Sequence, residues 1–299
     1  MRNKFIVSVV IPCFNNRTLL EKNLPSLIEA KNNNLNNIKE IIIVDDGSSD
    51  GTYEFIKKSY PTIKLFKHSI NRGFSAAVNS GVRSAKGELI LLMNTDVVPR
   101  ANFLVNIFDN FLDPDVFAVS LHENGYGPAR GSFSDGYIQL IKGVENNNKQ
   151  ESFYVSGGSG IFKRSIWFEL GGMDEKLLSP FYWEDIDLCY RAAKRGYKLI
   201  WEPGALVYHQ HESTVNKLPL TYVNQIRERN QLLMLWKNIT SKNLIRKHIF
   251  GIIKRSIKHP GYIRIVFMAL TKISILIPKR RREIKESKIS DEVIFAKYV

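Results

Sequence analysis

The sequence predicts an α/β protein built on a mostly parallel sheet flanked by helices, with a basic helical extension at its carboxyl end. Two observations predict the sheet. Apolar, β-branched runs alternate with segments of helical periodicity three times between residues 4 and 93. The central run is nearly continuously apolar, as expected of a strand buried on both faces. The second and central runs also end in polar residues, where the strands are expected to leave the sheet. Such alternation is typical of parallel strands joined by right-handed crossovers.

The elements can be assigned in chain order. The first strand ends at Pro12, and Leu20, Leu24 and Leu27 line one side of the helix that follows it. An Asn-rich loop then leads into the second strand. The expected elements are a strand at 4–11, a helix at 18–30, a strand at 40–44, a helix at 52–60, a short strand at 63–67, a helix after the loop that starts at 71, and a central strand at 88–93.

The central strand ends in Asn94-Thr95-Asp96. In open α/β sheets, ligands bind beyond the carboxyl ends of the strands. Side chains at i and i+2 of an extended chain point the same way, so Asn94 and Asp96 are spaced to hold one hard cation together with substrate phosphates. An ordinary Asn/Asp turn is the alternative interpretation of this tripeptide.

The composition is that of a globular protein, with 299 residues, 44% of them hydrophobic and 24% charged. Cys13 and Cys189 lie far apart and indicate neither a disulfide framework nor a zinc site, so we expect a reducing, cytoplasmic environment. The amino terminus lacks the cleavage region of a signal peptide. No Gly-x-Gly-x-x-Gly follows the first strand and no Walker-type Gly-Lys-Ser/Thr is present, which disfavours a dinucleotide fold and a P-loop NTPase.

Positive charge is concentrated in residues 237–299, which hold 16 Lys/Arg and 4 Asp/Glu, or +12 of the chain's +14. Within 243–282, one helical stripe is apolar: Ile263, Val266, Phe267, Leu270, Ile273 and Ile277. No run of about 18 uncharged residues is available to span a membrane. We expect a basic amphipathic helix lying on an anionic membrane surface, with packing on the rest of the chain or a homo-oligomer contact as the alternative. No recognition motif supports nucleic acid as a partner.

Taken together, the motifs at the strand ends resemble those of the family 2 glycosyltransferases. The resemblance covers about residues 5–236 and is nearest to the bacterial rhamnosyltransferase-like enzymes of polysaccharide assembly. The matching stretches, in the order of the family, are Val9 to Asn15, Ile43 to Thr52, Asn71-x-Gly73, Asn79-x-Gly81, Asn94-Thr95-Asp96, Gly157 to Gly160, Gly171 to Glu175, Trp183 to Leu188, Val207 to His209 and Arg229-Asn230. The resemblance implies the GT-A fold, with its Rossmann-like sheet, and inverting transfer from a nucleotide-sugar donor.

The resemblance also implies a donor site at the first strand ends. Asp45 or Asp46 would accept from the nucleoside base, and Pro12 and Phe14 would frame the base and ribose. An ordinary turn is the alternative for the two aspartates. The expected donor-binding residues are Pro12, Phe14, Asp45, Asp46, Arg72, Gly73, Asn94, Thr95 and Asp96.

The same resemblance implies a divalent cation, Mn²⁺ or Mg²⁺, held by Asp96 and His209 against the donor's diphosphate. His211, two residues on, would be secondary. Asn94 stands where the commonest form of the family motif has a first aspartate, so this position supplies no charge. That departure keeps open a rival function, in which a weak or inactive GT-A domain binds a nucleotide-sugar or glycan within an assembly complex.

Asp185 occupies the position of the family's catalytic base, at the start of a helix expected to run from 183 to about 195. Helix-start acids that complement the macrodipole are the alternative for Glu184 and Asp187. Trp183 would either stack on a sugar or belong to the core. The expected sugar and acceptor pocket comprises Gly157, Gly158, Ser159, Trp183 and Glu184.

These assignments divide the chain into a glycosyltransferase domain at 1–236 and a basic tail at 237–299. Residues 1–100 would form the nucleotide-binding half, and residues 101–236 the acceptor and catalytic half, with 110–155 as a variable, acceptor-facing region. The expected partners are a UDP- or dTDP-sugar, a glycan or lipid-linked acceptor, and the inner face of the cell membrane. A nucleotidyltransferase is disfavoured, because residues 12–16 are not the Gly-rich, Lys/Arg-bearing loop that it would carry.

Overall fold

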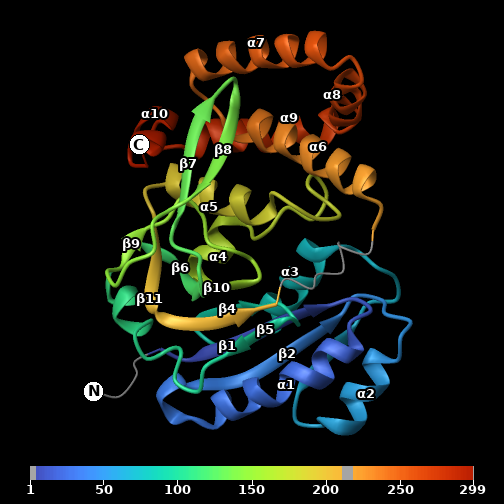
Figure 1. The fold of residues 1–299 in the computed structure, drawn as a ribbon, viewed down its shortest axis with the longest axis vertical. Helices are drawn as coiled ribbons and strands as arrows, with labels where there is room; N and C mark the ends of the chain where they lie inside the picture. Colours follow the sequence, from blue (N-terminus) through green and yellow to red (C-terminus); the bar gives the residue numbers. More distant parts are fainter. Residues whose placement is uncertain (1–4, 211–217, 299) are drawn as a thin grey trace.

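The computed structural model describes residues 5–210 and 218–298. Over this part of the chain, the main sheet has nine strands in the order β3-β2-β1-β4-β10-β6-β11-β5, with β9 paired to β11 (Figure 1). The strands are β1 (Val7–Cys13), β2 (Ile38–Asp45), β3 (Lys64–Lys67), β4 (Leu89–Met93), β5 (Val97–Pro99), β6 (Val116–Glu123), β9 (Gln150–Glu151), β10 (Ser159–Lys163) and β11 (Lys198–His209).

The amino-terminal half confirms the predicted alternation. Strands β3, β2, β1 and β4 are parallel neighbours. Every residue of β4 is buried, as its unbroken apolar run predicts. The connecting helices are α1 (Arg17–Asn32), α2 (Thr52–Ser59) and α3 (Phe74–Ser84), and short 3-10 helices lie at Asn34–Asn36 and Phe108–Leu112.

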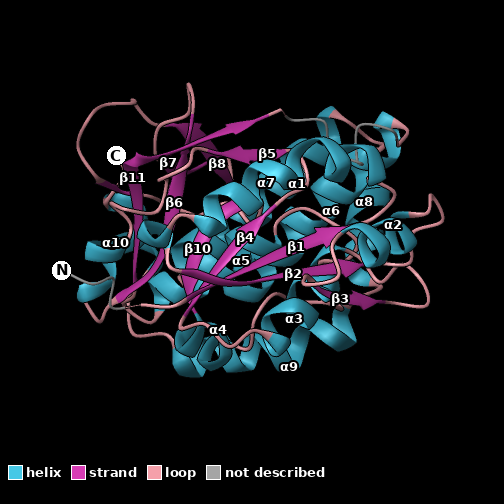
Figure 2. Ribbon diagram, turned by 90° about the horizontal axis from the view of Figure 1, so that it is seen from below, coloured by secondary structure: helices cyan, strands magenta, loops and turns pink. Residues whose placement is uncertain are grey.

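Helices cover both faces of the sheet, as Figure 2 shows. On one face, Leu20, Leu24 and Leu27 of α1 pack against alternate residues of β1 and β4. On the other face, α3, α4 (Arg164–Leu170) and α5 (Glu184–Lys194) form a second cluster around Val10 and Leu92. The alternation of side chains along each strand therefore divides the core into two layers.

The second half of the sheet is mixed. Strand β10 pairs antiparallel with both β4 and β6, and β11 pairs parallel with β6 and antiparallel with β5. Residues 110–155 were expected to face the acceptor, but they form β6, β9 and a separate hairpin, β7 (Ala129–Ser134) with β8 (Tyr137–Lys142). The hairpin packs on the carboxyl-terminal helices, and an acceptor-facing role of 110–155 stays a prediction.

The basic tail folds into several helices at one end of the molecule (Figure 1). They follow α6 (Leu220–Asn238) and comprise α7 (Lys242–Lys258), α8 (Tyr262–Leu270), α9 (Ile273–Glu286) and α10 (Asp291–Ala296). The predicted stripe is therefore split between α8 and α9, and Val266 is half-buried. Across residues 5–210 and 218–298, no helix has both the length and the hydrophobicity needed to cross a bilayer.

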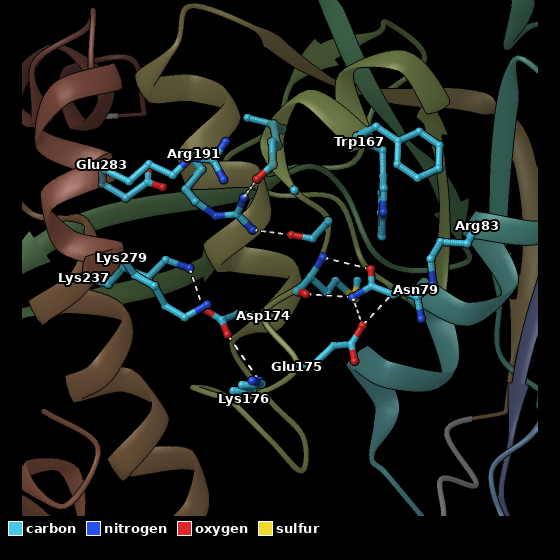
Figure 3. Close-up of a pocket in the computed structure, with 16 residues that line it drawn as sticks. Asn79, Arg83, Trp167, Asp174, Glu175, Lys176, Arg191, Lys237, Lys279 and Glu283 are labelled. Atoms are coloured by element: carbon cyan, nitrogen blue, oxygen red, sulfur yellow. Dashed lines mark hydrogen bonds and ion pairs between the residues drawn. The ribbon is translucent and has the colours of Figure 1, made fainter. Parts of the chain in front are cut away.

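Buried ion pairs connect α5 to the helices that follow it, around a cavity of about 370 Å³ (Figure 3). The ammonium of Lys237 lies 2.9 Å from Asp187 and 3.0 Å from Asp174. Lys279 lies 3.0 Å from Asp174. Asp291 forms a further buried ion pair with Lys194 of α5, at 2.8 Å. Asp187 thus belongs to a buried network of ion pairs, which gives this helix-start acid a structural role.

Candidate active site

A cavity of about 450 Å³ opens beyond the carboxyl ends of β1, β2 and β4, where parallel α/β sheets bind ligands. Many of its lining residues were predicted from the sequence motifs, although these come from segments far apart in the chain. Those residues are Pro12, Phe14, Asp46, Gly73, Asn94, Thr95, Asp96, Gly157, Gly158, Glu184 and Asp185.

Asn94-Thr95-Asp96 is held by backbone contacts where β4 ends. The Asn94 N–H donates to the Gly158 carbonyl at 2.9 Å. A Cβ on Gly158 would lie 2.4 Å from the Asn94 amide nitrogen, so a larger residue at 158 would displace the Asn94 side chain. The buried Asn23 donates to the Thr95 carbonyl at 2.9 Å. The tripeptide is therefore fixed by its surroundings rather than being an isolated turn.

Asp96 and His209 meet at the edge of this cavity. The pairing of β5 with β11 brings them together, and His209 Nε2 lies 3.2 Å from Asp96 Oδ1. Burial lowers the pKa of His209, but hydrogen bonds to Asp96 and Glu123 outweigh it and raise the pKa to about 9. No group of three or more His, Cys, Asp or Glu among the described residues is arranged to hold a metal. An oxygen and an imidazole nitrogen in contact nevertheless suit a divalent cation whose other ligands come from a diphosphate and water.

Glu123, at the end of β6, was not singled out in the sequence. Its Oε1 lies 2.9 Å from His209 Nδ1, on the side of the ring away from Asp96, and it also accepts a hydrogen bond from the Ser159 hydroxyl. Ser159 is buried and does not line the cavity, contrary to its predicted place in the sugar pocket. His211, the second predicted histidine, lies outside the described residues.

Asp46 organises the part of the cavity at the end of β2. Its carboxylate accepts from the backbone N–H groups of Arg72 (3.0 Å) and Gly73 (2.8 Å), and His68 Nδ1 lies 2.6 Å away. Gly73 has φ of 90°, in the region that favours glycine. Asp45 instead is buried outside the cavity, where it accepts from the Ser48 N–H at 2.9 Å. Of the two aspartates predicted to contact the nucleoside base, Asp46 is the one that lines the cavity.

Arg72 does not line the cavity, and its contact with the donor stays a prediction. Its guanidinium lies 3.3 Å from the Glu175 carboxylate, which also accepts hydrogen bonds from Asn79 at 3.0 Å and Arg83 at 3.2 Å. Asn79 further donates to the Met173 carbonyl at 2.8 Å. This part of the family pattern therefore supports the loop around 171–175 (Figure 3).

Glu184 and Asp185 open α5 side by side on the cavity wall. The Gly157 N–H donates to Asp185 Oδ2 at 3.2 Å. Burial raises the pKa of Asp185, although hydrogen bonds from the Gly157 and Ile186 N–H groups partly offset it. Burial and the neighbouring Asp185 charge hold the pKa of Glu184 well above its usual range. A carboxylate whose pKa is raised toward neutral pH is suited to accept a proton from a reacting hydroxyl.

The turn before α5 has unusual backbone geometry. Tyr182 and Trp183 have φ of 70° and 75°, a region that costs non-glycine residues free energy and occurs most often at functional sites. Asn230 holds this turn by donating to the carbonyls of Phe181 (2.9 Å) and Tyr182 (3.1 Å). Trp183 is directed into the core shared with the carboxyl-terminal helices and does not line the cavity, which favours its alternative as a core residue.

Four aromatic residues of the cavity were not predicted: Phe74, Phe181, Tyr182 and Tyr222. Phe74 follows the Asn71-x-Gly73 motif, Phe181 and Tyr182 precede the stretch Trp183 to Leu188, and Tyr222 lies at the start of α6. A single aromatic residue carries no sequence signal that separates a ligand-facing ring from a core ring. Together they give the cavity apolar walls around the carboxylates of Asp46, Asp96 and Asp185.

Comparisons with solved structures agree with this fold. A GalNAc-T7 structure with UDP, GalNAc and Mn²⁺ superposes with a TM-score of 0.64 at 17% identity, covering 88% of this chain and 57% of the other. The mannosyltransferase PcManGT from Pyrobaculum calidifontis, in complex with GDP-Man and Mn²⁺, gives 0.57 at 17% identity over 98% of this chain and 86% of the other. At these identities the likeness establishes the fold, which is the GT-A fold.

Sequence comparisons establish the family. The pre-mycofactocin glycosyltransferase of Mycobacterium tuberculosis is 29% identical over 221 residues, or 69% of this chain and 43% of that protein. The poly-beta-1,6-N-acetyl-D-glucosamine synthase of Staphylococcus aureus is 27% identical over 214 residues, or 68% and 49%. The chain thus spans less than half the length of these relatives. The profile of "Glycosyl transferase family 2" matches residues 8–169, more than half of the chain, and the chain therefore belongs to this family of glycosyltransferases.

Proposed function

We propose that this glycosyltransferase performs metal-dependent, inverting transfer of a sugar from a nucleotide-diphosphate donor to a hydroxyl of a glycan or lipid-linked saccharide, in cell-surface polysaccharide synthesis. The observation that carries the proposal is that Asp96 and Asp185, from the end of β4 and the start of α5, line one cavity. A metal-side and an acceptor-side carboxylate are what such a transfer requires.

Asp185 is the proposed base. It takes the proton of the attacking acceptor hydroxyl as the new bond to the anomeric carbon forms and the bond to the diphosphate oxygen breaks. Attack opposite the leaving group inverts the anomeric centre. Glu184, with its raised pKa, favours the protonated form beside Asp185, so that negative charge concentrates on the residue that accepts the proton.

Asp96 and His209 are the proposed metal ligands. A bound Mn²⁺ or Mg²⁺ would stabilise the negative charge that develops on the departing nucleoside diphosphate. The buried Asp96 carboxylate and the contact with His209 Nε2 support this assignment. Asn94 adds an amide to the same wall and is placed to contact the ribose or a phosphate. The Mn²⁺ in the GalNAc-T7 and PcManGT structures supports a divalent cation.

Asp46, Pro12 and Phe14 are proposed to hold the nucleoside, with Gly73 allowing close approach of the chain to the donor. A UDP- or dTDP-sugar is the proposed donor. The acceptor side is proposed to lie around Gly157, Gly158 and Asp185. The enzyme would work as a peripheral protein on the inner face of the cell membrane, in contact through residues 243–282.

A thermal-shift panel tests this function, with UDP-, dTDP- and GDP-sugars each measured with and without Mn²⁺ on the wild type and Asp96→Ala. A ligand that binds only the folded state raises its apparent stability. We expect one nucleotide class to stabilise the wild type in a metal-dependent way, and Asp96→Ala to lose that response. Turnover then separates the enzyme from the rival binding-domain function, because strong donor binding without transfer to any glycan acceptor favours the rival.

A further inference from the structure

We infer that the exposed sides of α7, α8 and the first turns of α9 form one docking face for an anionic lipid bilayer. This inference deepens the peripheral membrane contact of the proposed function. The docking face consists of Ile249, Phe250, Ile253, Ile257, Ile263, Phe267, Leu270, Ile273 and Ile277, together with the Lys and Arg residues between them.

Helix α7 has two faces of different character. Its inner face, with Leu244, His248 and Gly251, packs toward the β7–β8 hairpin, and His248 Nδ1 donates to the Gly136 carbonyl at 2.6 Å. On its outer face, Phe250 and Ile257 are 67% and 76% exposed. Because the inner face already anchors the helix, the outer apolar side chains are not needed to hold α7 on the protein.

The apolar face continues along α8 and α9. Ile263 and Phe267 lie one turn apart on α8 and are 54% and 62% exposed, and Ile273 and Ile277 repeat this spacing on α9. Figure 1 places α7 and α8 at the same end of the molecule, away from the central sheet. Exposed apolar residues gathered at one end of a molecule indicate an interaction surface.

Charge selects a bilayer rather than a second copy of the chain as the occupant. Residues 242–282 contain 12 Lys/Arg and no Asp or Glu. Four of these cations are paired within the protein, namely Lys254 with Asp135, Arg255 with Glu228, Lys279 with Asp174 and Arg282 with Glu286, and the remaining excess is still strongly positive. A two-fold contact would oppose this face to itself and bring like charges together, whereas anionic headgroups complement it. Exposed apolar side chains flanked by Lys and Arg are the composition of helices that lie in a membrane interface.

The docking face is linked to the donor cavity through α6. Helix α8 packs against α6. Leu218 and Tyr222, at the start of α6, line the cavity, and Leu220 between them is 77% exposed. A bilayer on the docking face would thus be connected to an apolar cavity rim, which suits an acceptor that carries a lipid.

Vesicle flotation with the full chain tests this inference and requires no donor, metal or turnover, so it can fail independently of the proposed reaction. The vesicles contain phosphatidylcholine alone or with one-third phosphatidylglycerol. We expect binding to the anionic vesicles, weakened at least tenfold in Phe250→Asn/Ile257→Asn and by raised salt. Leu112→Asn/Val144→Asn removes two similarly exposed apolar residues elsewhere and should bind like the wild type.

Three results would overturn the docking face: no binding of the wild type to anionic vesicles, equal binding by both double variants, or a wild-type dimer that Phe250→Asn/Ile257→Asn converts to a monomer. Light scattering after size exclusion measures the last of these. Thermal unfolding of each variant identifies a folding defect. If the variant is unstable, Phe267→Asn, on a different helix of the docking face, must show the same loss of vesicle binding.

A different contact carries a second inference: we infer that Glu123 is a positioning residue for the proposed metal ligand His209. Glu123 Oε1 faces His209 Nδ1 at 2.9 Å, while Nε2 faces Asp96 at 3.2 Å. The Ser159 hydroxyl donates to the same Glu123 oxygen. With a cation bound, Glu123 would hold the ring so that Nδ1 keeps its hydrogen and Nε2 faces the metal side.

Binding of Mn²⁺ to the purified protein, with and without UDP, tests this role through electron paramagnetic resonance. Removing a carboxylate that orients a ligating histidine typically weakens metal affinity about 10- to 100-fold. We expect a loss of this size in Glu123→Ala and a smaller loss in Glu123→Gln, whose amide oxygen can still accept from Nδ1. Glu145→Ala, which breaks the Glu145–His122 contact next to it, should keep wild-type affinity.

The outcomes separate this inference from the proposed metal site. Equal Mn²⁺ affinity in the wild type and Asp96→Ala would refute the metal site itself. If Asp96→Ala weakens binding and a folded Glu123→Ala does not, only the positioning role is wrong. A purely structural role would lower the melting temperature of Glu123→Ala without changing its Mn²⁺ affinity, and that result would also overturn the inference.

Discussion

Asp185 Oδ2 accepts a hydrogen bond from the backbone N–H of Gly157 at 3.2 Å, which joins the start of α5 to the loop before β10 on one cavity wall. An asparagine at 185 can preserve this hydrogen bond but cannot take up a proton. We therefore expect Asp185→Asn to reduce kcat by about 10²- to 10⁴-fold, the usual contribution of a positioned base. Donor binding, followed by thermal shift, should stay close to wild type. Substantial turnover in this variant would remove Asp185 from the role.

The contact between Asp96 and His209 predicts that the two residues act together on metal affinity. Asp96→Ala and His209→Ala should each weaken Mn²⁺-dependent donor binding, and the double variant should lose less than the sum, because the two side chains would share one ion. Calorimetric titration of the donor with and without Mn²⁺ measures this coupling. Fully additive losses would contradict a shared ion.

The buried network around Asp187 predicts a large effect on stability. Asp187 is fully buried and pairs with Arg191 (2.9 Å) and Lys237 (2.9 Å), and Asn238 donates to it at 2.8 Å. Removing one partner of a buried pair leaves an uncompensated charge, which costs roughly 3–5 kcal/mol. We expect Asp187→Ala to lower the free energy of unfolding by about this amount in urea titrations.

An exposed ion pair in the same protein provides the control for this prediction. Lys254 lies 3.1 Å from Asp135, but its side chain is 62% exposed. Exposed pairs contribute about 0–1 kcal/mol, so Lys254→Ala should change the unfolding free energy little. Similar losses in both variants would mean that burial of the Asp187 network does not determine its strength.

Much of the fold could be predicted because its signals are local. The apolar run of β4 and the spacing of Leu20, Leu24 and Leu27 specify buried elements by periodicity alone. The motifs predicted half of the residues that line the cavity, because parallel strands bring their carboxyl ends to one edge. The tail was predicted less well, since periodicity identifies an apolar stripe without saying whether it faces protein or solvent.

The missed site residues have a different cause. Glu123 is recognised only by its short distance to His209 in the folded protein. Nothing around it in the sequence distinguishes it from other acids at strand ends. Trp183 and Arg72 lie within recognised motifs, but their side chains turn away from the cavity. Their orientation depends on the positive φ of Trp183 and on Glu175, a partner 103 residues away from Arg72. Such tertiary features cannot be derived from spacing.

The buried aspartates on the carboxyl-terminal side also predict how stability depends on pH. The folded-state pKa of Asp174, Asp187 and Asp291 is lowered in each case. Burial alone would raise it, but Lys237 and Lys279 beside Asp174, Lys237 and Arg191 beside Asp187, and Lys194 beside Asp291 outweigh this effect. A lowered folded-state pKa means that the native protein favours the charged carboxylate. Its stabilising contribution is therefore fully present above the ordinary aspartate pKa of 3.8 and is lost as pH falls from there through the folded-state pKa. Each proton taken up on unfolding contributes a slope of about 1.4 kcal/mol per pH unit.

We therefore expect the unfolding free energy, measured in urea between pH 2.5 and about 6, to fall steeply on the acid side. In Lys237→Met the fall should be shallower, because Asp174 and Asp187 lose a shared cation and their folded-state pKa rises toward the unfolded value. An unchanged acid slope in Lys237→Met would show that these carboxylates do not control the pH dependence.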